Sequence, residues 1–222
     1  MRATKSSFAS RILNSLQRRL GVYVCHVLVR PWSEASAAPE RNSGLRYAVL
    51  ADAQVLAWCS DPELELDRRQ AASALRRGDV CIGVTQNRFP IGYVWYAYRT
   101  APHTRKLWVE FQRGLGYAYK AFIRPDHRGR GIGGDLYARG GELCPKKGTH
   151  SGISFIAVGN SPSMLAAERA GWRRVGYAGY ASFFGAMLPF RSAGAKRFGF
   201  CFYAPRGARL PTGPRETRTS AA

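Results

Sequence analysis

A glycine-rich turn between a predicted strand and a predicted helix constrains the fold of this chain more than any other feature. The strand covers residues 116–124 and is rich in aromatic and β-branched residues, which favour extended structure. Pro125 ends it. Four glycines then fall within six residues: Gly129, Gly131, Gly133 and Gly134. The sequence therefore predicts a strand, a flexible turn and a helix that ends near Cys144.

This turn is suited to binding an anion. The first turn of a helix presents unpaired backbone N–H groups and the positive end of the helix dipole. Glycines have no Cβ atom, so a phosphate group can approach the backbone closely. Arg128 and Arg130 add positive charge and several hydrogen-bond donors. The pattern indicates a site for a pyrophosphate or a similar group.

Two known phosphate-binding patterns fit this turn poorly. The spacing Gly129-x-Gly131-x-x-Gly134 matches the dinucleotide-binding pattern, which requires an acidic residue at the end of the next strand. The next predicted strand covers residues 153–158 and ends in Gly159 and Asn160, so it lacks that carboxylate. A P-loop is excluded because no Lys-Ser/Thr pair follows the glycines. A structural turn without a ligand stays open, although two arginines and four glycines are an unusual composition for one.

The segment Arg128-x-x-Gly131-x-Gly133 resembles the acyl-CoA signature of the GNAT superfamily of N-acetyltransferases. The segment from Asn160 to Trp172 is similar to a second element of that superfamily. The resemblance covers about Asp79 to Tyr180. It implies an α/β fold with a mixed, mostly antiparallel central sheet flanked by helices, as in acyl-CoA N-acyltransferases. It also implies that two central strands splay apart to admit the pantetheine arm of the cofactor.

The activity implied by the resemblance is transfer of an acetyl group from acetyl-CoA to a primary amine of a small-molecule or sugar-like acceptor, without a metal. By motif position, the backbone of the glycine turn would hold the pyrophosphate. The strand before it would pair with the pantetheine arm and polarise the thioester. Asn160 would contact the cofactor or, equally, cap a helix. The implied cofactor-binding residues are Phe122, Ile123, Arg128, Gly129, Arg130, Gly131, Ile132, Gly133, Gly134, Asn160 and Ser163.

The residues that would move protons are less well defined. Many members of the superfamily have a tyrosine that protonates the leaving thiolate, and Ala167 stands at that position here. Ser163, another tyrosine or water would replace it, or the protein binds CoA without transferring a group. Tyr119 and Glu110 are the candidate catalytic residues. Tyr119 shares a strand face with Tyr117, and burial of Glu110 among aromatic residues would raise its pKa. A core role for the tyrosines and a surface role for the glutamate are the alternatives.

The remaining pattern predicts the other elements of the sheet. Strands are expected over 22–29, 80–84, 91–98, 107–111, 173–184 and 197–203. Helices are expected over 45–58, over 61–77 from an Asp-Pro-Glu start, and from a cap at Ser161 to Gly171. The histidines His103 and His127 have no partner that the sequence identifies.

The charge of the chain predicts an acidic partner. Its formal net charge is +20, from 34 Lys and Arg against 14 Asp and Glu. Such an excess attracts CoA phosphates, nucleic acid or an anionic membrane surface. The alternative function is therefore a basic nucleic-acid or ribosome-binding protein on the same fold, with or without catalysis. The absence of a known RNA-binding motif weighs against it.

Three segments are expected: a basic amphipathic helix over 1–21, an acyltransferase domain over 22–205 and a disordered polar tail over 206–222. Apolar residues at helical spacing in the first segment would pack on the domain, lie on a membrane or form a transit peptide. Five cysteines without a C-x-x-C pair favour a reducing compartment. We therefore expect a cytoplasmic protein, with a peripheral position at the membrane as the alternative.

Overall fold

The computed structural model describes residues 21–32, 44–104, 106–144, 147–183 and 186–205. Nearly all of the expected N-terminal helix and the whole of the expected polar tail lie outside these ranges. The described secondary structure begins at Val22 and ends at Tyr203, within the expected domain 22–205. None of the described helices is long and apolar enough to cross a membrane.

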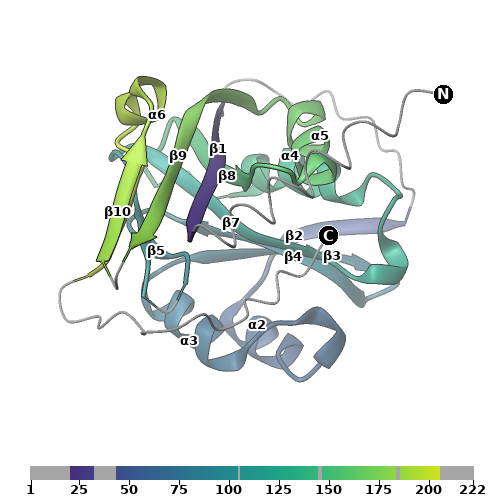
Figure 1. Ribbon diagram of the computed structural model, residues 1–222. Helices are drawn as coiled ribbons and strands as arrows, with labels where there is room; N and C mark the ends of the chain where they lie inside the picture. The colour runs from purple at the N-terminus through teal and green to yellow at the C-terminus, as the bar shows by residue number, and fades with distance from the viewer. Residues whose placement is uncertain (1–20, 33–43, 105, 145–146, 184–185, 206–222) are drawn as a thin grey trace.

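An eight-stranded sheet forms the centre of the molecule (Figure 1). Its strand order is β10-β9-β1-β8-β7-β4-β3-β2, and among the described strands only β7 and β8 pair in parallel. The expected mixed, mostly antiparallel sheet is therefore confirmed. The strands are β1 (Val22–Pro31), β2 (Leu45–Val49), β3 (Val80–Gln86), β4 (Phe89–Ala97), β7 (Leu115–Ile123), β8 (Ser151–Ala157), β9 (Arg173–Phe183) and β10 (Ala186–Arg191).

Helices cover both faces of this sheet. In Figure 1, α2 and α3 lie below it, and α4 and α5 lie above it. A small second sheet joins β11, β6 and β5 in that order. The remaining elements are α2 (Asp52–Trp58), the 3-10 helix η1 (Pro62–Leu64), α3 (Arg68–Arg76), β5 (Ala101–Pro102), β6 (Trp108–Glu110), the 3-10 helix η2 (Pro125–His127), α4 (Ile132–Leu143), α5 (Ser161–Arg169), α6 (Ala193–Arg197) and β11 (Cys201–Tyr203).

Three of the predicted boundaries are wrong. The expected helix over 45–58 is a strand, β2, followed by the short helix α2. The expected helix over 61–77 is two helices, because Glu65 adopts a left-handed conformation (φ 49°) and Asp67 caps a new start. Only Cys201–Tyr203 of the last expected strand is extended, since Arg197 ends α6. In each case the pattern of apolar or charged residues continues across the boundary between two elements, so the local sequence does not mark that boundary clearly.

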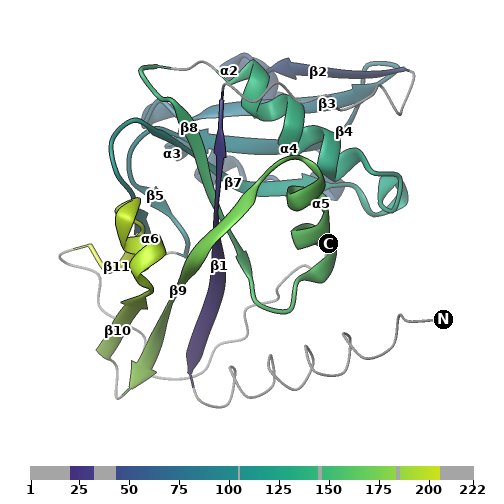
Figure 2. The same ribbon diagram turned by 90° about the horizontal axis from the view of Figure 1, so that it is seen from above.

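The two central strands separate after a short pairing. In the parallel ladder, Leu115, Gly116 and Tyr117 of β7 pair with Ser151, Gly152 and Ile153 of β8. Beyond this point β7 runs on to Ile123 and β8 to Ala157, but the two strands no longer pair with each other. Figure 2 shows the two strands diverging. We call this region the fork. It is the splayed geometry that the resemblance implies.

A buried hydrogen bond lies at the base of the fork. The Ser154 hydroxyl donates to the Ala118 carbonyl oxygen at 2.8 Å. A side chain thus satisfies a backbone group that the parallel ladder no longer reaches. On its other edge, β7 carries a bulge: Tyr119 pairs with Trp95 and Phe122 with Tyr93, so two residues of β7 lie opposite one of β4. Lys120 in this bulge has a positive φ of 50°.

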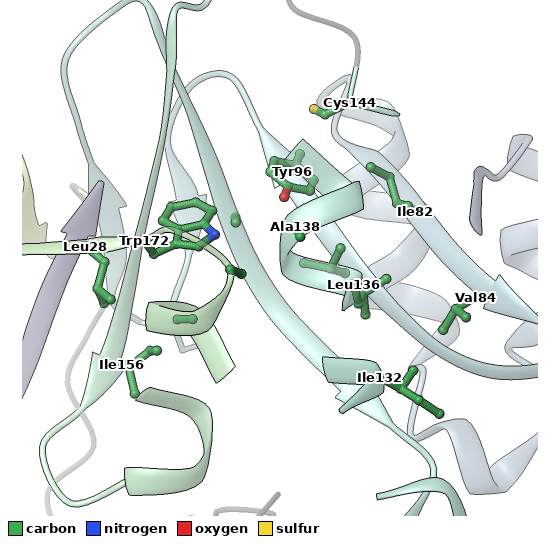
Figure 3. Packing of buried hydrophobic residues seen from close by; sticks show 14 of the residues in the cluster. Leu28, Ile82, Val84, Tyr96, Ile132, Leu136, Ala138, Cys144, Ile156 and Trp172 are labelled. Atoms are coloured by element: carbon green, nitrogen blue, oxygen red, sulfur yellow. The ribbon is translucent and has the colours of Figure 1, made fainter. Parts of the chain in front are cut away.

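Helix α4 packs closely on the sheet although it contains Gly140 and Gly141. The main core cluster lies beneath it, and in Figure 3 Ala138 and Leu136 lie below Tyr96, with Trp172 to their left. A Cβ atom on Gly141 would lie 2.6 Å from Cζ3 of Trp32, so only glycine permits this approach. The buried guanidinium of Arg30 donates to the Ala138 carbonyl oxygen at 2.9 Å. These contacts fix the position of the helix, and with it the glycine turn at its start.

The two ends of α4 should respond oppositely to alanine. Gly141→Ala should lower the free energy of unfolding by about 1–3 kcal/mol, because its methyl group overlaps the Trp32 ring. Gly133→Ala, in the first turn of the same helix, has no neighbour within 4 Å and should leave stability unchanged or raise it by about 0.5–1 kcal/mol. Urea unfolding of both variants measures the difference, and equal effects at the two positions would contradict this packing.

Candidate functional site

The glycine turn adopts the conformation that its composition predicts. The chain leaves β7, makes the single turn η2 and reaches Gly131, which is the N-cap of α4. Gly129 and Gly131 have φ values of 77° and 80°, in the left-handed region that favours glycine. The first backbone N–H groups of α4 follow directly, and such groups lack partners inside their own helix. They form the positive end of the helix.

The turn leaves open space on its outer side. Cβ atoms built on Gly129, Gly131 and Gly133 would meet nothing within 4 Å. The side chain of Ile132, in contrast, is buried in the main core cluster and anchors the first turn of α4. Gly134 faces α5, where its Cβ would lie 3.5 Å from the Ala166 carbonyl oxygen. An anion of the size of a pyrophosphate can therefore approach the backbone here without displacing side chains.

The two arginines of the turn are held by the backbone around it. The Nε atom of Arg128 donates to the Ile123 carbonyl oxygen at 3.0 Å, and its guanidinium lies 5.6 Å from the Phe122 ring centre. Arg130 donates to the Asp126 carbonyl oxygen at 3.1 Å. The Nδ1 atom of His127, for which the sequence identified no partner, lies 2.9 Å from an Asp126 carboxylate oxygen, and this contact lowers the pKa of the Asp126 carboxyl. The turn thus keeps positive charge beside its glycines.

Helix α5 lies beside α4 and begins at Asn160. The Asn160 side chain accepts a hydrogen bond from the Ser163 backbone N–H at 3.2 Å, so Asn160, and not Ser161, is the N-cap. The capping role given as an alternative for Asn160 is therefore observed. Ala167, at the position of the family's tyrosine, is buried in the main core cluster.

Aromatic side chains line the opposite face of the fork. Tyr117 and Tyr119 share this face as expected, with ring centres 5.5 Å apart and an angle of 12° between the rings. Phe155 of β8 stacks on Tyr117 at 6.1 Å. Tyr117 is fully buried, whereas Tyr119 and Phe155 are partly exposed. Tyr119 lies two residues beyond Tyr117, the last residue of β7 that pairs with β8, and so at the opening of the fork.

A polar cluster that the sequence did not reveal lies beside Tyr119. The Tyr119 hydroxyl donates to Asp79 at 2.7 Å, and Arg77 contacts the same carboxylate oxygen at 2.6 Å. Burial raises the pKa of the Asp79 carboxyl, and burial also raises that of the Tyr119 phenol. A phenol in this state is a proton donor near neutral pH and not a base on its own.

Glu110 differs from its expected environment. Its side chain is exposed on β6, and its backbone neighbour across the small sheet is Cys201. The expected burial of this carboxylate is not found, because Glu110 is the last residue of β6 and its side chain is exposed.

The described cavity lies away from the fork. It has a volume of about 230 Å³ and is lined by residues of β1, α5 and β9, among them His26, Ser161, Glu168 and Arg174. Asn160 and Ala157, the last residue of β8, border it too. We assign the functional site from the turn and the fork, because the chemistry-bearing residues gather there. Within the described residues, no group of three or more His, Cys, Asp or Glu side chains is placed to bind a metal ion.

The comparisons with known proteins concern the fold. No protein-family model and no curated protein matches the chain. Among solved structures, GCN5-related N-acetyltransferases from Sphaerobacter thermophilus and Kribbella flavida match with TM-scores of 0.48 and 0.49 and identities of 13% and 14%. They cover 81% and 78% of this chain, which spans only 55% and 64% of their length.

A third matching structure, yncA from Salmonella typhimurium, is described with its cofactor acetyl-CoA. It has a TM-score of 0.42, 16% identity and coverage of 77% of this chain and all of its own. Most of the matching structures belong to the GNAT class, the superfamily that the glycine signature resembles. These TM-scores are all below 0.5.

His103 is enclosed by aromatic rings beside the fork, among them Phe155 of β8. Its ring centre lies 5.1 Å from those of Tyr23 and Phe155 and 5.2 Å from that of Phe202. Burial lowers the pKa of His103 from 6.5 to about 4. The folded protein therefore favours the neutral imidazole, and the stabilisation is present in full above pH 6.5.

Lowering the pH should weaken the fold through His103. Because the folded pKa lies below the unfolded one, the contribution is lost as the pH falls from 6.5 to about 4, and we expect a loss on the order of 1–3 kcal/mol. His103→Phe fills the same aromatic site without a titrating group and should show a smaller loss. Urea unfolding at several pH values compares the two proteins. Parallel curves would show that His103 does not titrate in the folded core.

Proposed function

We propose that this protein is an acyl-CoA-dependent N-acetyltransferase that acetylates a primary amine. The observation that carries the proposal is that one strand, β7, leads both along the fork and into the glycine turn. A long cofactor with an anionic diphosphate and an amide-containing arm matches that arrangement. The diphosphate meets free N–H groups at the start of α4, and the arm meets the unpaired edge of β7.

The chain's own residues define how the cofactor would be held. The backbone N–H groups from Gly129 to Gly134 would bind the diphosphate, with Arg128 and Arg130 adding charge. Phe122 and Ile123 would offer their backbone groups to the pantetheine arm. Ser163 would lie near the cofactor from α5, while Asn160 orders the start of that helix. When bound, acetyl-CoA supplies the activated acetyl group.

The fork would also stabilise the charge that develops in the reaction. Attack of an amine on the thioester turns its carbonyl oxygen into an oxyanion, which backbone N–H donors stabilise. Beyond Tyr117 the edge of β7 that faces β8 no longer pairs with that strand, so its backbone N–H groups would be available for this purpose. The leaving thiolate needs a proton. Since Ala167 has no donor and is buried in the main core cluster, Ser163, a tyrosine from elsewhere in the chain or water would supply it.

The acceptor would approach from the aromatic face of the fork. Tyr119, Phe155 and Trp108 are partly exposed there, and a small or sugar-like amine is the class that we propose. A cytoplasmic location is proposed as well, because all five cysteines, each within the described residues, are free thiols. The charge of +20 leaves nucleic-acid binding as the competing function, and its signature would be steep salt dependence.

The first experiment is isothermal titration of the protein with acetyl-CoA and with CoA. We expect one site with micromolar affinity. Gly133→Glu should weaken binding more than about tenfold, because a carboxylate beside the diphosphate costs more than about 1.4 kcal/mol. Gly133→Gln has the same size without the charge and should weaken binding less.

Equal effects of glutamate and glutamine would place the diphosphate elsewhere. Absence of binding by the unaltered protein would overturn the proposal. In that case, a filter-binding titration with RNA at rising salt concentrations tests the competing function. Transfer itself is followed by the release of free CoA thiol in the presence of D-glucosamine or 2-phenylethylamine.

A further inference from the structure

We propose that Asp79, reached through the Tyr119 hydroxyl, accepts the proton that the acceptor amine loses before it attacks the thioester. This inference rests on the proposed function and names the residues that would prepare the acceptor. Asp79 is a buried carboxylate whose position in the fold does not itself require a charge. Asp79 follows α3 directly and is 7% exposed. Its backbone N–H already closes the helix by donating to the Ala74 carbonyl oxygen.

Two residues, Tyr119 and Arg77, hold the carboxylate. Tyr119 donates to its Oδ2 atom at 2.7 Å, and Arg77 lies 2.6 Å from the same atom. Arg77 also donates to the Tyr119 hydroxyl at 3.3 Å and lies 5.7 Å from the Trp108 ring centre. The hydroxyl of Tyr119 is thus held beside a proton acceptor, on a side chain that is partly exposed. Trp108, whose ring lies against Arg77, is partly exposed as well.

Within the described part of the chain, the charged or titratable groups that act on Asp79 are Arg77, Tyr119, Lys147 and Tyr98. Arg77 comes from the turn after α3, and Tyr119 from β7. Lys147, which follows α4, donates to the Gly78 carbonyl oxygen at 3.2 Å and lies 4.7 Å from the Tyr98 ring centre. Tyr98 in turn contacts the Cys144 thiol at 2.9 Å. Burial raises the pKa of Asp79, while the Tyr119 hydrogen bond and the charges of Arg77 and Lys147 act to lower it.

The proton transfers balance as follows. The ammonium group of the acceptor gives one proton to the Tyr119 oxygen as Tyr119 gives its own proton to Asp79, leaving a neutral amine and a neutral carboxylic acid. The amine nitrogen then forms a bond to the thioester carbonyl carbon, and the carbon–sulfur bond breaks as the oxyanion collapses. The second proton of the nitrogen neutralises the CoA thiolate. Asp79 returns its proton to solvent through Tyr119.

A purely structural cluster would behave differently from a proton acceptor. If Asp79 only closes the turn between α3 and β3, Asp79→Asn lowers stability and leaves the pH dependence of transfer in place. If it accepts the proton, the ionised carboxylate is required, so kcat/KM falls as the pH drops through its pKa. Removing the charge of Arg77 should move that decline to higher pH, since Arg77 acts to lower this pKa.

The test measures kcat/KM against pH for acetyl transfer to 2-phenylethylamine, whose ring suits the aromatic opening, and to D-glucosamine. Asp79→Asn should lower kcat by about 10²–10⁴-fold and abolish the acid-side decline. Tyr119→Phe should lower kcat as well, and Arg77→Gln should shift the decline to higher pH. Glu168→Gln, which breaks the exposed Glu168–Arg174 pair at 2.7 Å, is the matched control and should change neither quantity.

The outcomes separate this inference from the proposed function. All four variants should keep the acetyl-CoA affinity of the unaltered protein, since none touches the glycine turn. Loss of acetyl-CoA binding by the unaltered protein overturns the proposed function. Absence of transfer to either amine counts against the proposed function as well. Transfer by the unaltered protein, with an acid-side decline that persists in Asp79→Asn, overturns only the inference. Carbon-13 NMR of the Asp79 carboxyl gives a readout independent of activity: a pKa that Arg77→Gln does not raise contradicts the proposal.

Discussion

One buried hydrogen bond, from the Ser154 hydroxyl to the Ala118 carbonyl oxygen, lies where the two central strands stop pairing. Beyond it, β7 must leave the parallel ladder while its other edge stays paired with β4. A backbone edge inside a protein needs hydrogen-bond partners. A ligand with amide groups of its own can supply them. The fork therefore leaves backbone groups unpaired, which costs free energy, and it favours a ligand that pairs with those groups. The proposed cofactor site follows from that constraint.

The fork is useful only because rigid elements hold its surroundings. Arg30 and the contact between Gly141 and Trp32 place α4 on one face of the sheet, which directs the start of that helix toward the glycine turn. On the other face, Asp79 and Arg77 hold the Tyr119 hydroxyl at the opening. In the proposed function, β7 would separate a side that binds an anion from a side that handles protons. A group-transfer enzyme needs both, at a short distance from each other.

The sequence predicts the parts of this arrangement that depend on local conformation. Gly129 and Gly131 have the positive φ values that only glycine adopts easily, and Pro125 ends the strand before them. The run from Leu45 to Trp58 was misjudged because its spacing does not distinguish a strand followed by a helix from a single helix. Ser154 and Asp79 were missed for another reason. Their roles depend on partners 36 and 40 residues away, and a lone serine or aspartate carries no pattern that identifies such a partner.

The most direct test of the account is to map the binding of CoA on the backbone amide signals of the protein by nitrogen-15 NMR. We predict the largest shifts at residues 129–134 of the glycine turn and at residues 119–123 of β7, with small shifts around the cavity beside His26. This result would place the diphosphate on α4 and the pantetheine arm in the fork. Shifts concentrated at Arg174, Glu168 and His26, with the turn unchanged, would contradict the account and place the binding site at the cavity that these residues line.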